Sequence, residues 1–86
     1  MTALRERVAE LTSEASDGDV TADEILVHGG SLIALGVSSL ATMRLIAAVE
    51  VEFGVELDLD TLAFDPDDFD DLVRHLAERG ARAADG

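Results

Sequence analysis

The 86-residue chain contains no cysteine and no lysine. Without cysteine it forms neither a disulfide nor a thiolate metal site, and nothing in it indicates secretion. No window approaches the ~20 apolar residues of a membrane span. Charged residues interrupt the apolar positions of the first 15 residues, which is unlike a signal peptide. We therefore expect a cytoplasmic protein with no membrane segment.

The chain is also too short for more than one small domain. A domain of this size buries only ~60–65% of its unfolded surface, so its core is modest. Such a core cannot also enclose a deep active site. The length therefore favours a binding or carrier module over an enzyme.

Acidic residues dominate the composition: 19 Asp and Glu face six basic residues, all of them arginine, which gives a net charge of -13. This charge repels phosphate backbones, so we expect no nucleic-acid partner. It favours encounters with basic patches on other proteins. Acidity alone is typical of disorder, but 48% of the residues are hydrophobic and they recur at regular spacing. A folded domain is the better interpretation.

The first predicted helix follows Thr2, its expected cap, and ends at the turn formed by residues 16–19. Its inward stripe is Leu4, Val8, Leu11 and Ala15. The connection from Val20 to Ser38 is unusually long for a small domain. Thr21 and Glu24 match a capping box, which predicts a short helical turn. We expect this loop to pack onto the bundle through Ile25, Leu26, Leu32, Ile33 and Leu35.

A second long helix is predicted from about Ser39 to Phe53, with Gly54 as its C-cap. One face is expected to carry Leu40, Met43, Ile46, Ala47, Glu50 and Phe53. Leu45, Ala48 and Val49 widen the apolar arc to more than half of the circumference. Such a helix is either central or has an exposed apolar face.

The last helix is predicted to follow Asp65 as its cap, with Pro66 at the first helical position. Its inward stripe is Phe69, Leu72, Val73 and Leu76. A short helix is expected near residues 59–64, although the alternation there also fits a strand. These elements predict an all-α bundle of three long helices and one short helix, with a long loop between the first two long ones. We assign residues 1–80 to the domain and residues 81–86 to a frayed tail.

Motifs of familiar active and metal sites are absent. The chain has neither a phosphate-binding loop nor a His-Glu-x-x-His zinc pattern. The acidic run of residues 65–71 resembles part of a calcium loop but lacks its turn glycine and closing glutamate. A helix cap followed by a solvated acidic face explains the run better. We expect no catalytic residue and no bound metal.

The serine pair Ser38 and Ser39 is explained, on local residues alone, as the start of a helix. The surrounding stretch "LGVSSLATMRLIAAVEVEFGVEL" resembles the signature of acyl and peptidyl carrier proteins. That signature is Leu-Gly-x-Asp-Ser-Leu, followed by a helix that ends in Glu-x-x-Phe-Gly-Val-x-Leu. The matching positions, without a gap, are Leu35, Gly36, Ser39, Leu40, Leu45, Glu50, Phe53, Gly54, Val55 and Leu57. The resemblance implies the acyl-carrier-like four-helix bundle.

The resemblance further implies that Ser39 carries a 4′-phosphopantetheine arm from coenzyme A, attached by a separate phosphopantetheinyl transferase that uses magnesium. The thiol of the arm would hold an acyl or aminoacyl group as a thioester. The residues agree with this role, because a helix N-terminus with unpaired N–H groups suits a phosphodiester anion. We expect Ser38, Leu40, Met43 and Arg44 to contact docking partners.

Two positions depart from the family pattern. Ser38 stands where the family usually has aspartate. Serine retains the helix cap but lacks the negative charge of aspartate. We therefore expect modification to be slower, to need a dedicated transferase or not to occur. Arg44 lies in the recognition helix, where fatty-acid carriers are typically acidic.

We therefore predict a monomeric, free-standing carrier of polyketide or nonribosomal-peptide biosynthesis. Its partners would be synthases, ligases or adenylation enzymes of that pathway. The alternatives are a carrier of fatty-acid synthesis and an unmodified, carrier-like interaction or regulatory module. A small helical enzyme is disfavoured, because no base is near either serine in sequence.

Overall fold

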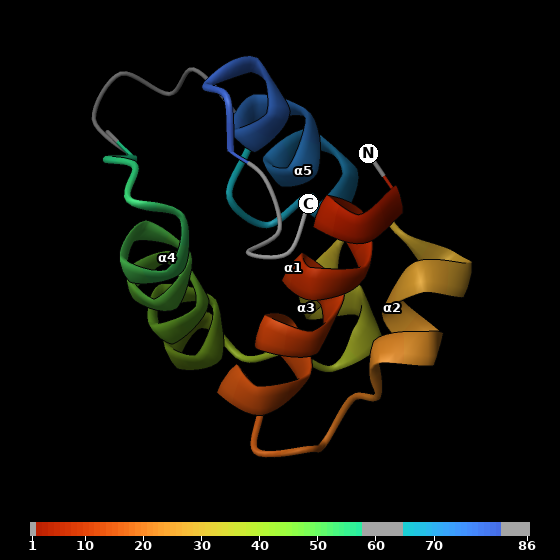
Figure 1. Cartoon of the computed structure of the whole chain (residues 1–86). Coiled ribbons are helices and arrows are strands. Elements are labelled where there is room, and N and C mark those ends of the chain that lie inside the picture. Colours follow the sequence, from red (N-terminus) through yellow and green to blue (C-terminus); the bar gives the residue numbers. More distant parts are fainter. Residues whose placement is uncertain (1, 58–64, 82–86) are drawn as a thin grey trace.

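The computed structural model describes residues 2–57 and 65–81. Within these ranges the chain forms five helices, and the only β-structure is one isolated antiparallel bridge between Ser31 and Asp68. The helices are α1 (Thr2–Ala15), α2 (Ala22–His28), α3 (Leu32–Leu35), α4 (Ser39–Phe53) and α5 (Phe69–Glu78). The all-α bundle is thus confirmed (Figure 1). The short helix expected at residues 59–64 lies outside the described residues.

Helix α1 organises the core, because it packs against α4 and α2 and also contacts α5. It begins at Thr2 itself, which we expected to precede it as the cap. The inward stripes of α1 and α5 are as predicted, except that Ala15 is only partly buried. The large side chains they bury are Leu4, Val8, Leu11, Phe69, Leu72, Val73 and Leu76. Each contributes roughly 1.5–3 kcal/mol when fully removed from water.

The long connection between α1 and α4 contains two short helices, α2 and α3, where we expected one short helical turn. The capping box predicted at Thr21 and Glu24 is present and starts α2. A second cap, Ser31, starts α3 by accepting the Ala34 N–H. The segment packs onto the core through Ile25 and Leu32, whereas Leu26 and Leu35 are only partly buried. Ile33 is 56% exposed, so its predicted burial was wrong.

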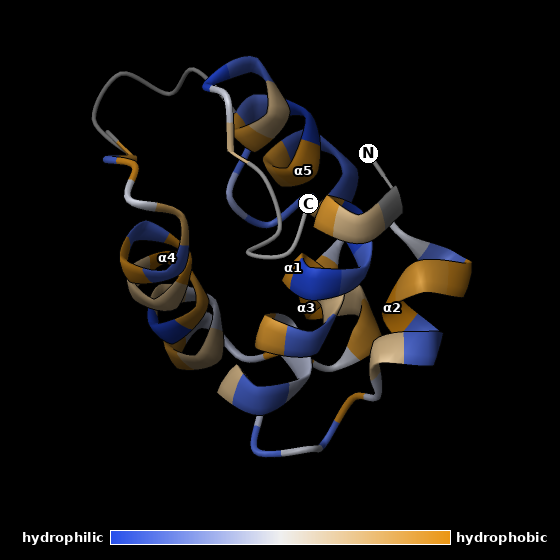
Figure 2. Ribbon diagram, in the orientation of Figure 1, coloured by the Kyte–Doolittle hydropathy of each residue, from blue (hydrophilic) through white to orange (hydrophobic). Residues whose placement is uncertain are grey.

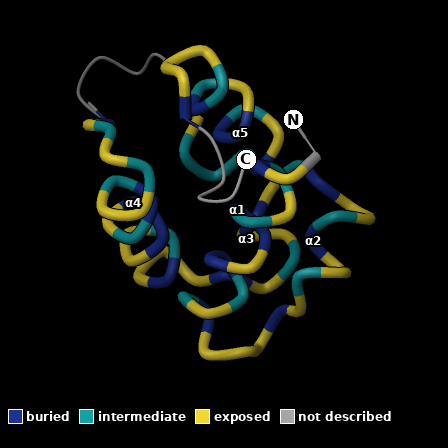
Figure 3. The backbone as a smooth tube through the Cα atoms, viewed as in Figure 1, coloured by how far each residue is buried: buried dark blue, intermediate teal, exposed yellow. Residues whose placement is uncertain are grey.

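Helix α4 has the predicted bounds and the predicted C-cap, Gly54. The sequence left open which part of its wide apolar arc faces inward, and the residues that the structure buries are Ala41, Leu45, Ile46 and Val49. These positions recur at intervals of about four residues on the side that packs against α1, whereas Leu40 and Met43 are exposed. Figure 3 shows buried and exposed positions following one another along α4. The apolar arc is wider than the contact with α1, so part of it stays exposed. Figure 2 shows the resulting hydrophobic positions along α4.

Helix α5 begins later than predicted. Its cap is Asp68, which accepts the Asp71 N–H, and not Asp65. Asp65 instead accepts the N–H groups of Asp67 and Asp68 in a preceding turn. The reason lies outside the helix, since Asp68 has an extended backbone (φ -91°, ψ 112°) that pairs with Ser31. The pairing prevents the helix from continuing back to Pro66.

Candidate functional site at the start of helix α4

The two serines at the start of α4 have different surroundings. The Oγ of Ser38 accepts the N–H of Ala41 at 3.0 Å, and its carbonyl oxygen accepts that of Thr42 at 2.9 Å. Ser38 is therefore the N-cap, as predicted. Ser39 is the first helical residue and is exposed. Its hydroxyl makes no hydrogen bond within the part of the chain that the structure describes. Ser39 is the serine with an available nucleophilic oxygen.

A short and well-anchored connection fixes the position of Ser39. Gly36 ends α3 with a left-handed backbone (φ 108°), a conformation that glycine adopts without steric cost. Its N–H donates to Ile33 O at 3.0 Å. The next residue, Val37, is 1% exposed, and its N–H donates to Leu32 O at 2.9 Å. The buried Val37 therefore holds the chain immediately before the serine pair.

The start of α5 holds α3 in place, and sequence reasoning missed this contact. Asp67 accepts the Ser31 hydroxyl at 2.6 Å and the Ile33 N–H at 2.9 Å. Its own carbonyl oxygen accepts the Leu32 N–H at 2.8 Å. The Phe69 N–H completes the pairing by donating to Gly30 O at 2.8 Å. We call the contacts of residues 67–70 with residues 29–33 the α3–α5 latch.

Asp70 is the second carboxylate of the α3–α5 latch. It accepts the Gly30 N–H at 3.0 Å and pairs with Arg5 of α1 at 2.6 Å. The Arg5 guanidinium, and then the Gly30 N–H, lower the pKa of Asp70 below its ordinary value. This approach requires glycine at position 29, because a Cβ there would lie 2.5 Å from the Asp70 carboxylate. Arg5 also stacks on Phe69, 4.9 Å from the ring centroid.

The acidic run of residues 65–71 is therefore not simply the solvated face that we predicted. Asp71 accepts the Asp65 N–H at 2.7 Å and is paired with Arg74. The Asp65 N–H, followed by Arg74, lowers the pKa of Asp71. Within the described ranges, no three His, Asp or Glu side chains lie together as a group that would hold a metal ion. Its carboxylates instead accept hydrogen bonds from backbone N–H groups and so fix the conformation of the chain around the start of α5.

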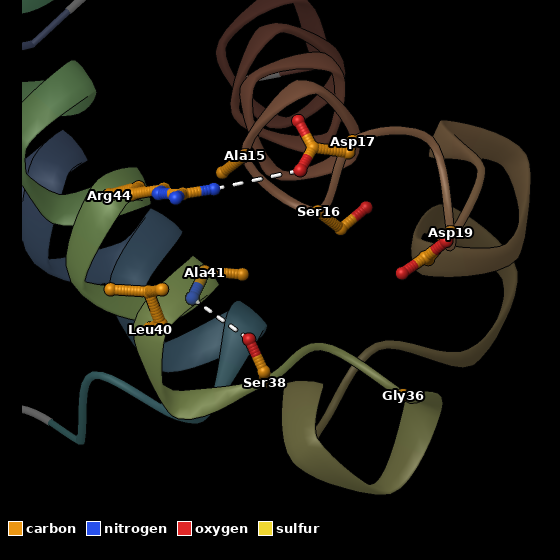
Figure 4. A pocket seen from close by; sticks show the side chains of 9 residues that line it. All are labelled: Ala15, Ser16, Asp17, Asp19, Gly36, Ser38, Leu40, Ala41 and Arg44. Atoms are coloured by element: carbon orange, nitrogen blue, oxygen red, sulfur yellow. Dashed lines mark hydrogen bonds and ion pairs between the residues drawn. The ribbon is translucent and has the colours of Figure 1, made fainter.

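A cleft of about 290 Å³ opens beside the serine pair (Figure 4). It lies between the turn after α1 and the first part of α4. Its lining residues are Ala15, Ser16, Asp17, Asp19, Gly36, Ser38, Leu40, Ala41 and Arg44. Arg44 and Asp17 reach toward each other across it, with 3.6 Å between Nη1 and Oδ2. The sequence marked Asp17 and Asp19 only as part of a helix end, because nothing local connects them with α4.

Of the four predicted docking residues, the structure brings Ser38, Leu40 and Arg44 together along this cleft. Met43 is 58% exposed on the outward side of α4, and Leu40 is 62% exposed. Val51, which we did not predict, is 85% exposed near the other end of the helix. Of the two readings that the sequence left open for α4, the helix with an exposed apolar face is confirmed.

The surroundings of Ser39 suit a covalently attached phosphate. A phosphodiester on its Oγ would lie at the first turn of α4, where the positive end of the helix dipole and unpaired N–H groups stabilise an anion. Nothing in the described part of the chain competes for that oxygen. No helix in that part is long and apolar enough to cross a membrane.

Comparison with known proteins agrees with this fit. The family model described as "Phosphopantetheine attachment site" matches residues 2–76, which is most of the chain. No curated protein and no solved structure matches it. The family's covalent cofactor is 4′-phosphopantetheine, and its members are carrier proteins. The match includes α1, the two short helices, the serine pair and most of α5. The chain belongs to the phosphopantetheine attachment family.

Proposed function

We propose that Ser39 is the residue that carries the phosphopantetheine arm. The observation that carries this proposal is the exposed Ser39 hydroxyl at the first position of α4, without a hydrogen bond in the described structure. Ser38 is unsuited to the role, because its Oγ caps the helix at the Ala41 N–H. Loading at Ser38 would cost the helix a cap worth about 1 kcal/mol. Loading at Ser39 leaves that cap intact.

In the modification, the Ser39 oxygen forms a bond to the phosphorus that bears the pantetheine in coenzyme A. The bond from that phosphorus to the 3′,5′-ADP leaving group breaks at the same time. The serine proton must pass to a base of the transferase, because no described side chain accepts it. Magnesium bound with the transferase would neutralise charge on the phosphates of coenzyme A. Once attached, the arm supplies the thiol that holds cargo as a thioester.

We further propose that the carrier serves a polyketide or nonribosomal-peptide pathway and has no catalytic residue of its own. The outward face of α4 supports the pathway, because Leu40, Met43 and Arg44 present an apolar and cationic surface beside Ser39. From Ser39 to Val49 the helix carries no acidic residue. A partner enzyme that docks here needs an apolar surface rather than a strongly basic one. That is unlike the acidic face typical of fatty-acid carriers.

The intact mass of the purified chain tests the attachment. The chain is incubated with coenzyme A, magnesium and a broad-specificity phosphopantetheinyl transferase. We expect one phosphopantetheine increment that is lost in Ser39→Ala and kept in Ser38→Ala, the matched control one residue away. If the mass increment were still present in Ser39→Ala, the arm would be attached to another residue and the proposal would be wrong. No increment with any transferase would favour the unmodified interaction module.

A further inference from the structure

The cleft beside the serine pair has no role in the attachment reaction proposed above. It is bounded by residues on both sides of Ser39, because Ser38 and Leu40 both line it. Ser39 is not itself a lining residue, so an arm that begins there starts beside the cleft and reaches it past Ser38 or Leu40. We propose that this cleft is a docking site for the polar middle of the arm, the pantetheine. This inference rests on attachment at Ser39.

The chemistry of the lining matches the pantetheine chain. That chain carries a dimethyl carbon one methylene away from the phosphate ester oxygen, followed by a hydroxyl and two amides. The exposed Leu40 side chain, at the rim, offers an apolar contact for the methyl groups. The carboxylates of Asp17 and Asp19 accept hydrogen bonds from amide N–H and hydroxyl groups, and Arg44 donates to amide carbonyls. An acyl chain would find few apolar partners there.

The size of the cleft limits what it holds. At about 290 Å³ it lies just below the range of ~300–1,000 Å³ that is typical of pockets for drug-sized ligands. It therefore fits part of the arm and not the arm together with a long cargo. We expect the same cleft contacts whether the thiol is free or carries a short or a long acyl group.

The wall opposite α4 is built before the arm arrives. Ser16 is 6% exposed; its hydroxyl donates to Ser13 O at 2.8 Å and accepts the Val20 N–H at 3.3 Å. The Gly18 N–H donates to Ser13 O at 2.9 Å, which closes the turn around Asp17. The two carboxylates are thus presented on a fixed turn, so little ordering is needed on binding.

The ion pair across the cleft is weak enough to break when the arm binds. Arg44 and Asp17 are 3.6 Å apart, and their side chains are 54% and 84% exposed. Exposed pairs of this kind contribute little to stability. Arg5 and Arg7, by contrast, hold carboxylates at 2.6 and 2.7 Å. Arg44 can therefore exchange its carboxylate for an amide oxygen of the arm.

Tethering makes weak contacts sufficient. A short flexible tether gives an effective concentration on the order of millimolar, so even a millimolar site would be substantially occupied. Such a site also releases the arm readily to a partner enzyme. The cleft would shield the arm between encounters without trapping it.

Two-dimensional amide NMR tests the cleft on protein whose complete loading has been checked by intact mass. We expect shift changes at Ser16–Asp19 and Gly36, together with nuclear Overhauser effects from arm protons to Ala15. In Arg44→Gln these effects should be lost, while the matched control Arg79→Gln, at the end of α5, should retain them. Acetyl- and octanoyl-loaded protein should show the same pattern. Complete loading with changes confined to residues 37–43, or with arm contacts on another face, would overturn the proposal.

Free pantetheine separates failure of the cleft from failure of the attachment. Added at millimolar concentration to Ser39→Ala, which cannot be loaded at position 39, it should shift the amides of residues 16–19. These shifts without any loading of the wild-type chain would refute attachment at Ser39 but support the cleft. Loading without these shifts, in either the free or the tethered experiment, would refute the cleft and leave the attachment standing.

Discussion

Removing the Asp67 side chain should destabilise the fold, although most of the chain around it stays the same. In Asp67→Ala the Ser31 hydroxyl and the Ile33 N–H lose their acceptor, at 2.6 and 2.9 Å. Hydrogen bonds to a charged group contribute roughly 1.5–3 kcal/mol each when shielded, and we assign about 1 kcal/mol each here because water reaches the site. The expected loss is therefore about 2 kcal/mol. The backbone pairing of Leu32 with Asp67 O survives the substitution, so the α3–α5 latch is weakened and not abolished.

Urea unfolding, followed by circular dichroism, measures this loss. For a domain of this size, about 2 kcal/mol corresponds to a fall of about 8–16 °C in the melting temperature. Asp67→Asn should lose about half as much, because its amide oxygen still accepts the Ile33 N–H and its amide N–H still reaches Ser31 Oγ. Hydrogen exchange at the Ile33 amide should accelerate in the alanine variant.

A matched control is needed because the chain has a net charge of -13, so losing any carboxylate relieves repulsion. Asp23→Ala provides it. Asp23 is exposed in the first turn of α2, where its interaction with the helix dipole contributes only about 0.3–1 kcal/mol. A difference between the two alanine variants below about 0.5 kcal/mol would refute the reasoning, since ordinary surface substitutions have effects of that size.

Three further predictions follow from the same contacts. Ser38→Asp keeps a good cap and restores the missing charge, so we expect a faster initial rate of phosphopantetheine loading and a change in stability of less than about 0.5 kcal/mol; an unchanged rate would contradict a role for that charge. Glu50→Ala should cost about 1–2 kcal/mol in urea unfolding, because the Leu57 N–H loses its acceptor at 2.9 Å, whereas Glu50→Gln should cost less. The pKa of Asp70 is lowered by Arg5 and the Gly30 N–H, so its contribution is fully present above the ordinary value of 3.8 and fades as the pH falls below it. The stability difference between wild type and Asp70→Asn should therefore shrink between pH 5 and pH 2, and a constant difference would exclude this linkage.

Structural features that depend on residues three or four positions apart could be predicted from the sequence. The capping box at Thr21, the caps Ser38 and Gly54, and the bounds of α4 all belong to this class. Each depends on one side chain or one backbone angle close to the helix end, so its residue pattern is local. The inward stripe of α5 is equally local, because one helix period defines it.

Features set by distant segments were not readable. The start of α5 depends on pairing with Ser31, 36 residues before Asp67, which overrides the local signal of Asp65 and Pro66. The inward face of α4 depends on where α1 packs, because the apolar arc is wider than the contact. The same holds at the candidate site. Ser39 is predicted as the attachment residue from its flanking pattern, whereas the cleft depends on the fold, which brings Asp17 beside Arg44.

The placement of charge matters more for recognition than the net value of -13. Asp67 and Asp70 accept backbone N–H groups of residues 33 and 30, so these two carboxylates already have partners within the chain, although they remain accessible to water. The surface next to Ser39 instead presents Leu40, Met43 and Arg44. Long-range attraction to basic proteins still raises the encounter rate. For the docking on α4 that we propose, apolar fit would decide the choice of partner, because that face offers no carboxylate for pairing before Glu50. A basic enzyme surface built to pair with acidic carrier helices would meet Arg44 there, and like charges at such a contact disfavour the complex.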